Sequence, residues 1–272
     1  MSTWILLRGL TREQGHWGDF VSQLKAALPA GDQVLTPDLP GNGTLCNQRS
    51  PIRVEDMMQA CRQMLLAQGH RPPYQVVAMS LGAMVTVAWA DHHPQEIDHC
   101  VLINTSLRPY SPFWQRLRPR QYPIILKLLL TNAGTAQWED AILRMTTRHP
   151  VNAQAMMAHW LALRQQHPVS VPNGLRQLWA ASRYRAPASK PGVPMLLLNS
   201  QGDQLVNPAC SAVLAQHWQV PMLRHPTAGH DLPQDAGPWV VQQVLAWLAQ
   251  PSSQRAQAHS AAQASQARNP NP

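Results

Sequence analysis

The sequence has few charged residues, few cysteines and no long apolar run, and each of these absences excludes a class of protein. Hydrophobic residues make up 44% and charged residues 13%, which excludes a largely disordered chain despite 25 prolines. No stretch approaches the ~20 apolar residues needed to cross a bilayer, and the apolar run at residues 4–7 is too short for the core of a secretion signal. We therefore expect a globular protein of the cytoplasm.

The four cysteines do not form a recognisable site. They stand at positions 46, 61, 100 and 210, without the close spacing of a zinc site or the density of a small secreted scaffold. We find no internal repeat at a fixed period. The sequence predicts reduced thiols and no bound metal.

Positive charge is concentrated in one part of the chain. Between Arg108 and Lys190 there are 12 basic residues and 2 acidic ones, and the rest of the chain has 10 and 12. A sequence pI near 9.9 makes nucleic acid a candidate partner. The basic segment contains no recognisable nucleic-acid-reading motif, so a solvated basic surface is the better interpretation and no nucleic-acid partner is expected.

Short apolar runs alternate with helical patterns along most of the chain. The predicted strands are residues 3–7, 33–36, 74–79, 100–104, 195–199 and 222–224. The helical patterns between them cover residues 17–28, 51–69, 83–90, 208–218 and 237–249. This alternation predicts an α/β fold with a mainly parallel, doubly wound sheet covered by helices on both faces.

The alternation stops between residues 107 and 188. This segment has no convincing strand, and helical patterns cover residues 124–130, 137–145 and 153–166. We expect a helical lid inserted over the C-terminal edge of the sheet, within a core formed by residues 1–106 and 189–250. Residues 251–272 contain almost no large apolar side chain, and a disordered tail is predicted there.

Ser80 stands where an apolar strand turns into a helix. Residues 76–83 read Val-Val-Ala-Met-Ser-Leu-Gly-Ala. Small residues two positions before and after the serine, here Ala78 and Gly82, let strand and helix approach closely and expose the hydroxyl. The pattern indicates a nucleophile elbow, and the alternative is an ordinary serine at a strand-to-helix connection.

A serine hydroxyl is a weak nucleophile until a base removes its proton, so a histidine and a carboxylate must follow. Asp203 follows the predicted strand at residues 195–199, and His230 follows the last predicted strand and is preceded by glycine. Taken singly, an aspartate or a histidine has structural explanations. Three strand ends carrying the required residues in the order serine, acid, histidine predict a triad with Ser80 as nucleophile, His230 as base and Asp203 as the orienting carboxylate.

Acyl transfer also requires hydrogen-bond donors for the developing oxyanion. The backbone N–H of Leu81, at the start of the helix after the nucleophile, is one predicted donor. The second should come from the loop after the first strand, where Leu10 is the candidate and Gly9 would allow a close approach.

These motifs resemble those of the α/β-hydrolase superfamily, particularly compact carboxylesterases with a helical lid such as those similar to pimeloyl-carrier-protein methyl esterase. The matching parts are residues 5–10 with Trp17 downstream, 37–43, 78–82, 202–206 and 229–230. The chain departs from the family pattern at three positions. Arg8 and Asn42 stand where histidine is usual, and Ala78 stands where glycine is usual.

The resemblance implies hydrolysis of a carboxylic ester through an acyl-enzyme on Ser80, with neither a metal nor an organic cofactor. Arg8 is expected to pair with an acid or to attract a substrate carboxylate. Trp17, Arg118 and Arg120 are further candidates for substrate binding, and the basic lid would favour an anionic or carrier-bound ester. Two alternatives stay open: an acyl thioesterase with the same triad, and an inactive homologue that binds a ligand under its lid.

Overall fold

A parallel six-stranded sheet forms the centre of the chain. The computed structural model describes residues 1–130 and 134–251. The strand order is β2-β1-β3-β4-β5-β6, and every neighbouring pair is parallel. The strands are β1 (Thr3–Leu7), β2 (Gln33–Leu35), β3 (Tyr74–Met79), β4 (Ile97–Ile103), β5 (Met195–Ser200) and β6 (Met222–His225).

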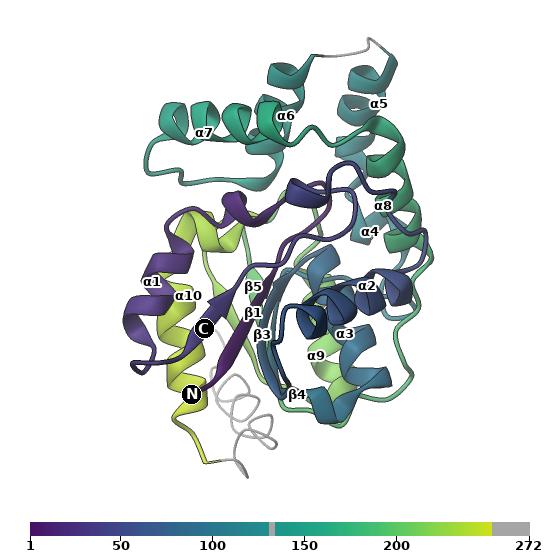
Figure 1. Ribbon diagram of the computed structural model, residues 1–272. Coiled ribbons are helices and arrows are strands. Elements are labelled where there is room, and N and C mark those ends of the chain that lie inside the picture. Colours follow the sequence, from purple (N-terminus) through teal and green to yellow (C-terminus); the bar gives the residue numbers. More distant parts are fainter. Residues whose placement is uncertain (131–133, 252–272) are drawn as a thin grey trace, which may run out of the picture.

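Helices cover both faces of this sheet, with α1 and α10 on one face and α2, α3 and α9 on the other (Figure 1). Their bounds are α1 (Phe20–Ala27), α2 (Val54–Ala67), α3 (Leu81–His92), α9 (Ala209–Trp218) and α10 (Leu232–Leu248). Short 3₁₀ helices lie in connecting segments at Gln14–Trp17, Gly43–Leu45, Pro94–Glu96 and Pro119–Gln121. The predicted parallel, doubly wound α/β fold is confirmed.

The sheet separates two hydrophobic clusters. Ile5 and Leu7 of β1 belong to the cluster under α2, α3 and α9, whereas Trp4 and Leu6 belong to the cluster under α1 and α10. All four side chains are almost fully buried. Because successive residues of a strand point to opposite faces, a strand buried on both faces has a continuous apolar sequence.

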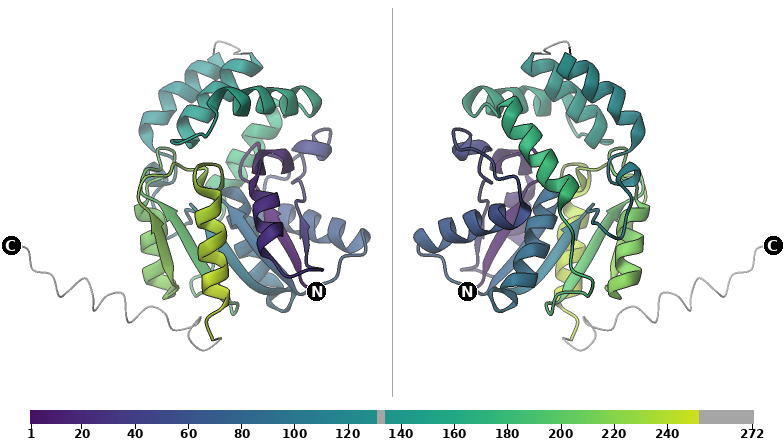
Figure 2. Two further views of the ribbon diagram at one scale, coloured as in Figure 1. Left: turned by 90° about the vertical axis from the view of Figure 1, so that its left-hand side faces the viewer. Right: turned by 90° about the vertical axis from the view of Figure 1, so that its right-hand side faces the viewer.

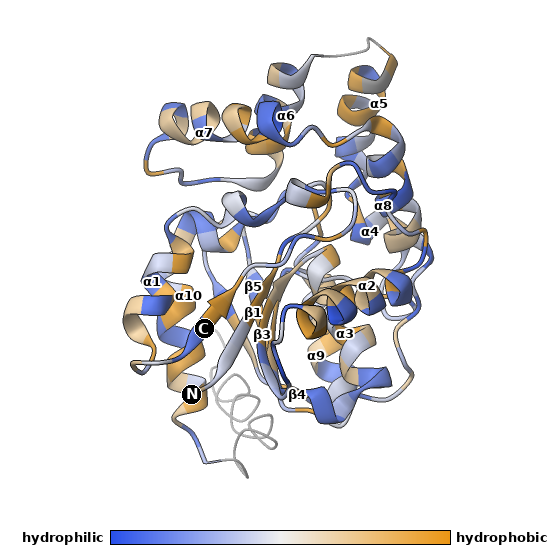
Figure 3. Cartoon of the chain, in the orientation of Figure 1, coloured by the Kyte–Doolittle hydropathy of each residue, from blue (hydrophilic) through white to orange (hydrophobic). Residues whose placement is uncertain are grey.

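The segment between β4 and β5 is helical. It contains α4 (Phe113–Arg116), α5 (Tyr122–Leu130), α6 (Thr135–Thr146), α7 (Ala153–Gln166) and α8 (Val171–Arg183), and no strand in its described part. Figure 2 shows α5, α6 and α7 above the carboxyl edge of the sheet. Hydrophobic residues dominate α5 (Figure 3). We call residues 107–188 the lid segment, and the division of the chain into core and lid domains stays a prediction.

Several helix boundaries differ from the predicted ones. The first helix begins at Phe20 instead of residue 17, because Gly18 has a positive φ of 52° and ends the preceding 3₁₀ turn. Helix α10 begins five residues earlier than predicted, at Leu232, and bends at Ala236 ahead of Pro238.

Helix α8 is absent from the prediction. Pro172 and Gly174 in its first turn disguise the helical pattern, yet proline is favourable at the start of a helix. The hydroxyl of Ser170 accepts a hydrogen bond from the N–H of Asn173 and caps this end.

The predicted tail, residues 251–272, lies outside the described residues apart from Pro251. None of the helices in residues 1–130 and 134–251 combines the length and apolar composition required to cross a bilayer.

Candidate active site

Ser80 occupies the sharp turn between β3 and α3. Its backbone has φ 53° and ψ −118°, a conformation that residues with side chains rarely adopt. Its N–H donates a hydrogen bond to the carbonyl of Ile103 at 3.0 Å, which fastens the turn to the neighbouring strand β4. The serine side chain is therefore presented at the carboxyl edge of the sheet, as a nucleophile elbow requires.

Small residues around Ser80 make this turn possible. A methyl group added to Gly82 would lie 2.7 Å from the carbonyl oxygen of Arg8, which is too close for any real contact. Ala78 is fully buried in β3, so its methyl group is accommodated where the family usually has glycine. A methyl group on Gly9 would lie 3.1 Å from the Ser80 Cβ, so the loop after β1 passes directly beside the serine.

His230 and Asp203 form a buried hydrogen-bonded pair. The His230 Nδ1 atom lies 2.7 Å from Asp203 Oδ2, and the residues are 3% and 1% exposed. The other carboxylate oxygen accepts hydrogen bonds from the N–H groups of Leu205 at 2.8 Å and Val206 at 2.9 Å. These donors fix the carboxylate, and the carboxylate in turn fixes the plane of the imidazole ring.

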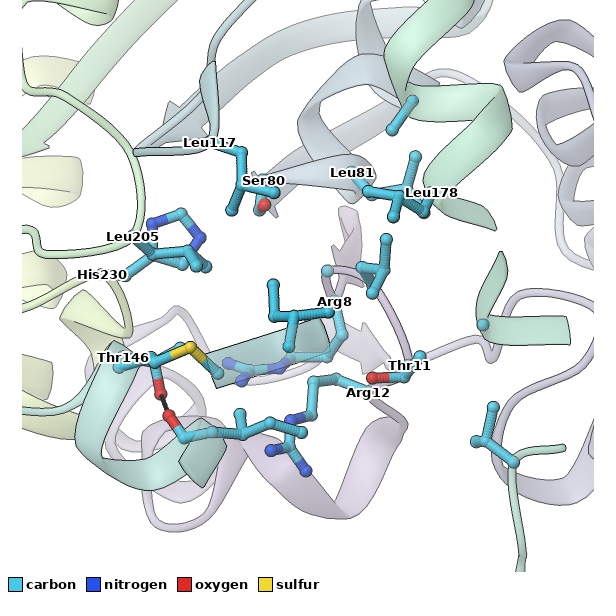
Figure 4. Close-up of a pocket in the computed structure, with 18 of the residues that line it drawn as sticks. Arg8, Thr11, Arg12, Ser80, Leu81, Leu117, Thr146, Leu178, Leu205 and His230 are labelled. Atoms are coloured by element: carbon cyan, nitrogen blue, oxygen red, sulfur yellow. Dashed lines mark hydrogen bonds between the residues drawn. The ribbon is translucent and has the colours of Figure 1, made fainter. Parts of the chain in front are cut away.

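Ser80 and His230 face the same cavity (Figure 4). The cavity has a volume of about 850 Å³ and lies between the carboxyl edge of the sheet and the lid segment. Its lining is mainly apolar and includes Leu10, Leu117, Trp138, Ile142, Leu178 and Leu205. The structure thus joins His230 to Asp203 by a hydrogen bond and places Ser80 on the same cavity as His230, although Ser80 and His230 are 150 positions apart in the sequence.

Of the two predicted oxyanion donors, Leu81 follows Ser80 in the chain, and Leu10 follows Gly9, which passes beside the serine. Leu81 is the first residue of α3, and the N–H groups of a first helical turn have no partner within the helix. The N–H of Leu10 donates to no acceptor in residues 1–130 and 134–251. Both residues line the cavity. Their amides are therefore free to receive an oxyanion formed near Ser80.

Asn104, which the sequence did not single out as a site residue, connects Ser200, three positions before Asp203, to His230. Its Nδ2 donates to Ser200 Oγ at 2.9 Å and to the His230 carbonyl at 2.8 Å. The N–H of Ser200 donates to its Oδ1 at 2.8 Å. Asn104 is 1% exposed and directly follows β4. One sequence signal could have identified Asn104: it is a polar residue directly after an apolar strand. Such strand ends lie at the edge of the sheet that carries the predicted triad residues.

Arg8 forms a buried ion pair with Asp231, the residue after His230. Arg8 Nη1 and Nη2 donate to the two carboxylate oxygens at 3.0 and 2.5 Å, and both side chains are 4% exposed. Of the two roles predicted for Arg8, the structure shows the pairing with an acid. The Arg8 Cζ atom lies over the Trp17 ring, 4.8 Å from the centre of that ring, and Trp17 is fully buried. Arg8 covers the Trp17 ring, and Trp17 is not part of the cavity lining, so its predicted part in substrate binding stays a prediction.

Arg118 and Arg120 hold the loop of the predicted catalytic aspartate. Arg118 Nη1 donates to the carbonyl of Asp203 at 2.7 Å, and Arg120 donates to the carbonyl of Gln204 from Nε at 3.3 Å and Nη2 at 3.1 Å. Neither arginine lines the cavity. Their predicted part in substrate binding stays a prediction.

The Arg8–Asp231 pair yields a stability prediction. In Asp231→Asn the buried Arg8 cation loses its counter-ion, so we expect the free energy of unfolding to fall by about 3–5 kcal/mol. For a chain of this size the melting temperature should drop by roughly 6–20 °C, measured by calorimetry. The control is Asp140→Asn, which breaks the exposed Asp140–Arg144 pair and should cost less than about 1 kcal/mol. An unchanged melting temperature in Asp231→Asn would show that the pair contributes nothing to stability.

Comparisons with known structures support the fold. A hydrolase from Pseudomonas aeruginosa PA01 has a TM-score of 0.71 at 18% identity, covering 92% of this chain and 90% of that chain. An esterase from Thermogutta terrifontis has a TM-score of 0.70 at 18% identity, with 91% and 89% covered. An enol-lactonase from Burkholderia xenovorans LB400 has a TM-score of 0.69 at 19% identity, with 92% of each chain covered. At these identities the likeness concerns the fold alone.

No curated protein matches this sequence. The model of the alpha/beta hydrolase family matches residues 4–243, which include both oxyanion candidates and all three triad candidates. The match therefore extends over the sheet apart from Thr3, the lid segment and the cavity between them. The chain belongs to the alpha/beta hydrolase family.

Proposed function

We propose that this protein hydrolyses a carboxylic ester through an acyl-enzyme on Ser80. The proposal depends mainly on the observation that two features face the same apolar cavity. One is a serine held at a strained strand-to-helix turn. The other is the buried pair of His230 and Asp203. A histidine that a carboxylate orients can make a serine of the same site reactive by removing its proton.

The proposed reaction has two halves. His230 removes the proton from Ser80 Oγ as this oxygen attacks the ester carbonyl, and the amides of Leu10 and Leu81 stabilise the oxyanion. The leaving alcohol takes the proton from His230, and the acyl group stays on Ser80. A water molecule, deprotonated by His230, then attacks the acyl carbon; the bond to Ser80 Oγ breaks as His230 returns the proton to this oxygen, and the carboxylic acid leaves. Asp203 keeps the imidazole oriented and stabilises its transient positive charge.

The cavity suits an extended apolar acyl group. Its lining includes Leu117 and Leu178 of the lid segment and Leu205, two positions after Asp203. Burial of each additional methylene group is worth about 0.8 kcal/mol, which corresponds to roughly a fourfold gain in binding. The lining therefore favours long acyl chains over acetyl.

A series of p-nitrophenyl esters of increasing acyl length tests this proposal. We expect kcat/KM to rise by up to about fourfold per methylene until the chain fills the cavity. Leu178→Arg places a charge in the lining and should remove the gain for long chains. Leu126→Arg is the matched control, because Leu126 lies on the exposed surface of the lid segment, outside the cavity.

Acyl-CoA thioesters of the same chain lengths belong in the same series, because a thioesterase would use the same residues. A preference for thioesters would reassign the leaving group while retaining Ser80 as nucleophile. If the folded protein hydrolyses neither the esters nor the thioesters but still binds fatty acids, the inactive ligand-binding homologue is favoured.

A further inference from the structure

The loop after β1 contains a strained turn. The N–H of Arg12 donates a hydrogen bond to the carbonyl of Gly9 at 3.2 Å, so residues 9–12 form a turn. Within it Thr11 has a φ of 56°, which is an outlier for a β-branched residue. Such a conformation persists only where the surroundings hold it. The same turn carries Leu10, whose N–H is the proposed oxyanion donor, so the contacts that hold the turn also hold this donor.

Gln177 of helix α8 in the lid segment provides one of these contacts. Its Oε1 accepts a hydrogen bond from the N–H of Thr11 at 2.8 Å. Its Nε2 donates to Asn42 Oδ1 at 2.7 Å, and Asn42 Nδ2 donates to the carbonyl of Arg12 at 3.0 Å. Gln177 and Asn42 are both 0% exposed. Two buried side-chain amides thus form a closed ring of hydrogen bonds with two consecutive residues of the turn, which Figure 4 shows beside the cavity.

The backbone fixes the hydrogen-bonding roles in this ring. A backbone N–H can only donate, so the Gln177 atom that faces Thr11 is the oxygen. A backbone carbonyl can only accept, so the Asn42 atom that faces Arg12 is the nitrogen. The remaining nitrogen of Gln177 and oxygen of Asn42 then face each other as donor and acceptor. Each of these groups therefore has the partner that its chemistry requires.

Helix α8 uses different faces for the core and for the cavity. On the buried face, Asn173 Oδ1 accepts from the N–H of Ser50 at 2.9 Å, and Gln177 Nε2 donates to Ser50 Oγ at 3.0 Å. Leu175 and Leu178, on another face, line the cavity. The helix that would contact the acyl chain of an ester is therefore also the helix whose buried amide holds the turn at residues 9–12.

We propose that Gln177 is a positioning residue, which couples helix α8 to the turn that carries Leu10 and so keeps the Leu10 N–H where the oxyanion forms. This inference rests on the proposed function. Without Gln177 the N–H of Thr11 loses its acceptor, and Thr11 can relax to the negative φ that a β-branched residue prefers. The turn then shifts, and the Leu10 N–H stabilises the oxyanion less. Because the oxyanion does not exist in the bound ester, the loss should appear in kcat and not in KM.

The test compares Gln177→Met with Asn173→Leu. Both variants remove buried hydrogen bonds between α8 and the core and keep a side chain of similar size, but of the two residues only Gln177 bonds to the turn. With a long-chain p-nitrophenyl ester we expect kcat of Gln177→Met to fall by about 10- to 100-fold, which is at most the effect of deleting an oxyanion donor. KM should change by less than about twofold.

Two controls separate positioning from general packing. Asn173→Leu should lower the melting temperature as much as Gln177→Met does and keep the wild-type kcat. Gln177→Glu retains an oxygen that can accept from the N–H of Thr11, so it should keep more of the wild-type kcat than Gln177→Met. Equal losses of kcat in Asn173→Leu and Gln177→Met would overturn the inference, because the loss would then come from loosening of α8 as a whole.

An inhibitor measures the oxyanion site without turnover. The carbonyl carbon of a long-chain trifluoromethyl ketone forms a bond with Ser80 Oγ, the serine proton moves to His230, and the ketone oxygen becomes an oxyanion. The matching fatty acid fills the same cavity without forming this bond. Gln177→Met should bind the ketone about 10- to 100-fold more weakly and the fatty acid as tightly as the wild-type protein does. Equal losses of affinity for both ligands would contradict the positioning role.

The outcome also distinguishes this inference from the proposed function. If the wild-type protein hydrolyses esters and a folded Gln177→Met variant keeps the same kcat, the inference fails and the proposed function stands. If the folded wild-type protein hydrolyses no ester, the proposed function fails, and the role of Gln177 in the reaction fails with it.

Discussion

Replacing Ser80 with alanine is expected to lower kcat/KM for the best ester by at least ~10³-fold while leaving the fold intact. The substitution removes one oxygen atom, which is the proposed nucleophile, and leaves the cavity and the oxyanion donors in place. Residual turnover should reflect only binding and the oxyanion donors. Initial rates with a chromogenic ester, together with a calorimetric melting curve, measure both parts of this prediction.

Ser106 provides the matched control for this variant. It is a second serine in the cavity lining and is 3% exposed, but it lies outside the strand-to-helix turn. Ser106→Ala should therefore lose far less activity than Ser80→Ala. Near-normal turnover by a folded Ser80→Ala variant would disprove the triad.

Asp203→Asn is expected to reduce kcat by about 10³- to 10⁴-fold, by analogy with other triads that lose their carboxylate. An amide presents a donor to His230 Nδ1, so the imidazole adopts the tautomer in which Nε2 carries the proton and cannot accept one from the serine. The stabilisation of the imidazolium is lost as well. His230→Ala should resemble the serine variant. Rates measured across a range of pH would show the loss at every pH at which the wild-type protein is active.

Asp231 is the competing carboxylate, because it directly follows the histidine. The structure assigns it to Arg8, with two hydrogen bonds, so Asp231→Asn should act mainly on stability. Full activity in Asp203→Asn combined with an inactive but folded Asp231→Asn would show that the orienting carboxylate has been misassigned.

Much of the fold was predictable because its signals are local. The strands at Thr3–Leu7 and Tyr74–Met79 and the helix at Ala153–Gln166 have the predicted bounds. Each of these elements is buried on one or both sides, and the positions of its apolar residues in the sequence follow from that burial. The Ser80 turn was predictable for the same reason, since the small residues that it needs are two positions away.

The surroundings of the site were not predictable, because long-range contacts create them. Arg12 and Glu139 are 127 positions apart, and only the packing of the lid segment against the loop after β1 pairs them. The charge of Arg118 and Arg120 is visible in the sequence, whereas the carbonyl groups to which these arginines donate hydrogen bonds are not. A cytoplasmic location and the closer resemblance to lidded methyl esterases stay predictions.

Labelling with a fluorophosphonate probe tests the central claim most directly. The probe reacts covalently only with a serine that a neighbouring base activates, so it does not depend on knowledge of the natural substrate. We predict a single adduct, located by peptide mass spectrometry at Ser80, absent in Ser80→Ala and formed much more slowly in Asp203→Asn. No adduct in the folded wild-type protein, or an adduct on a different serine such as Ser106, would contradict the account.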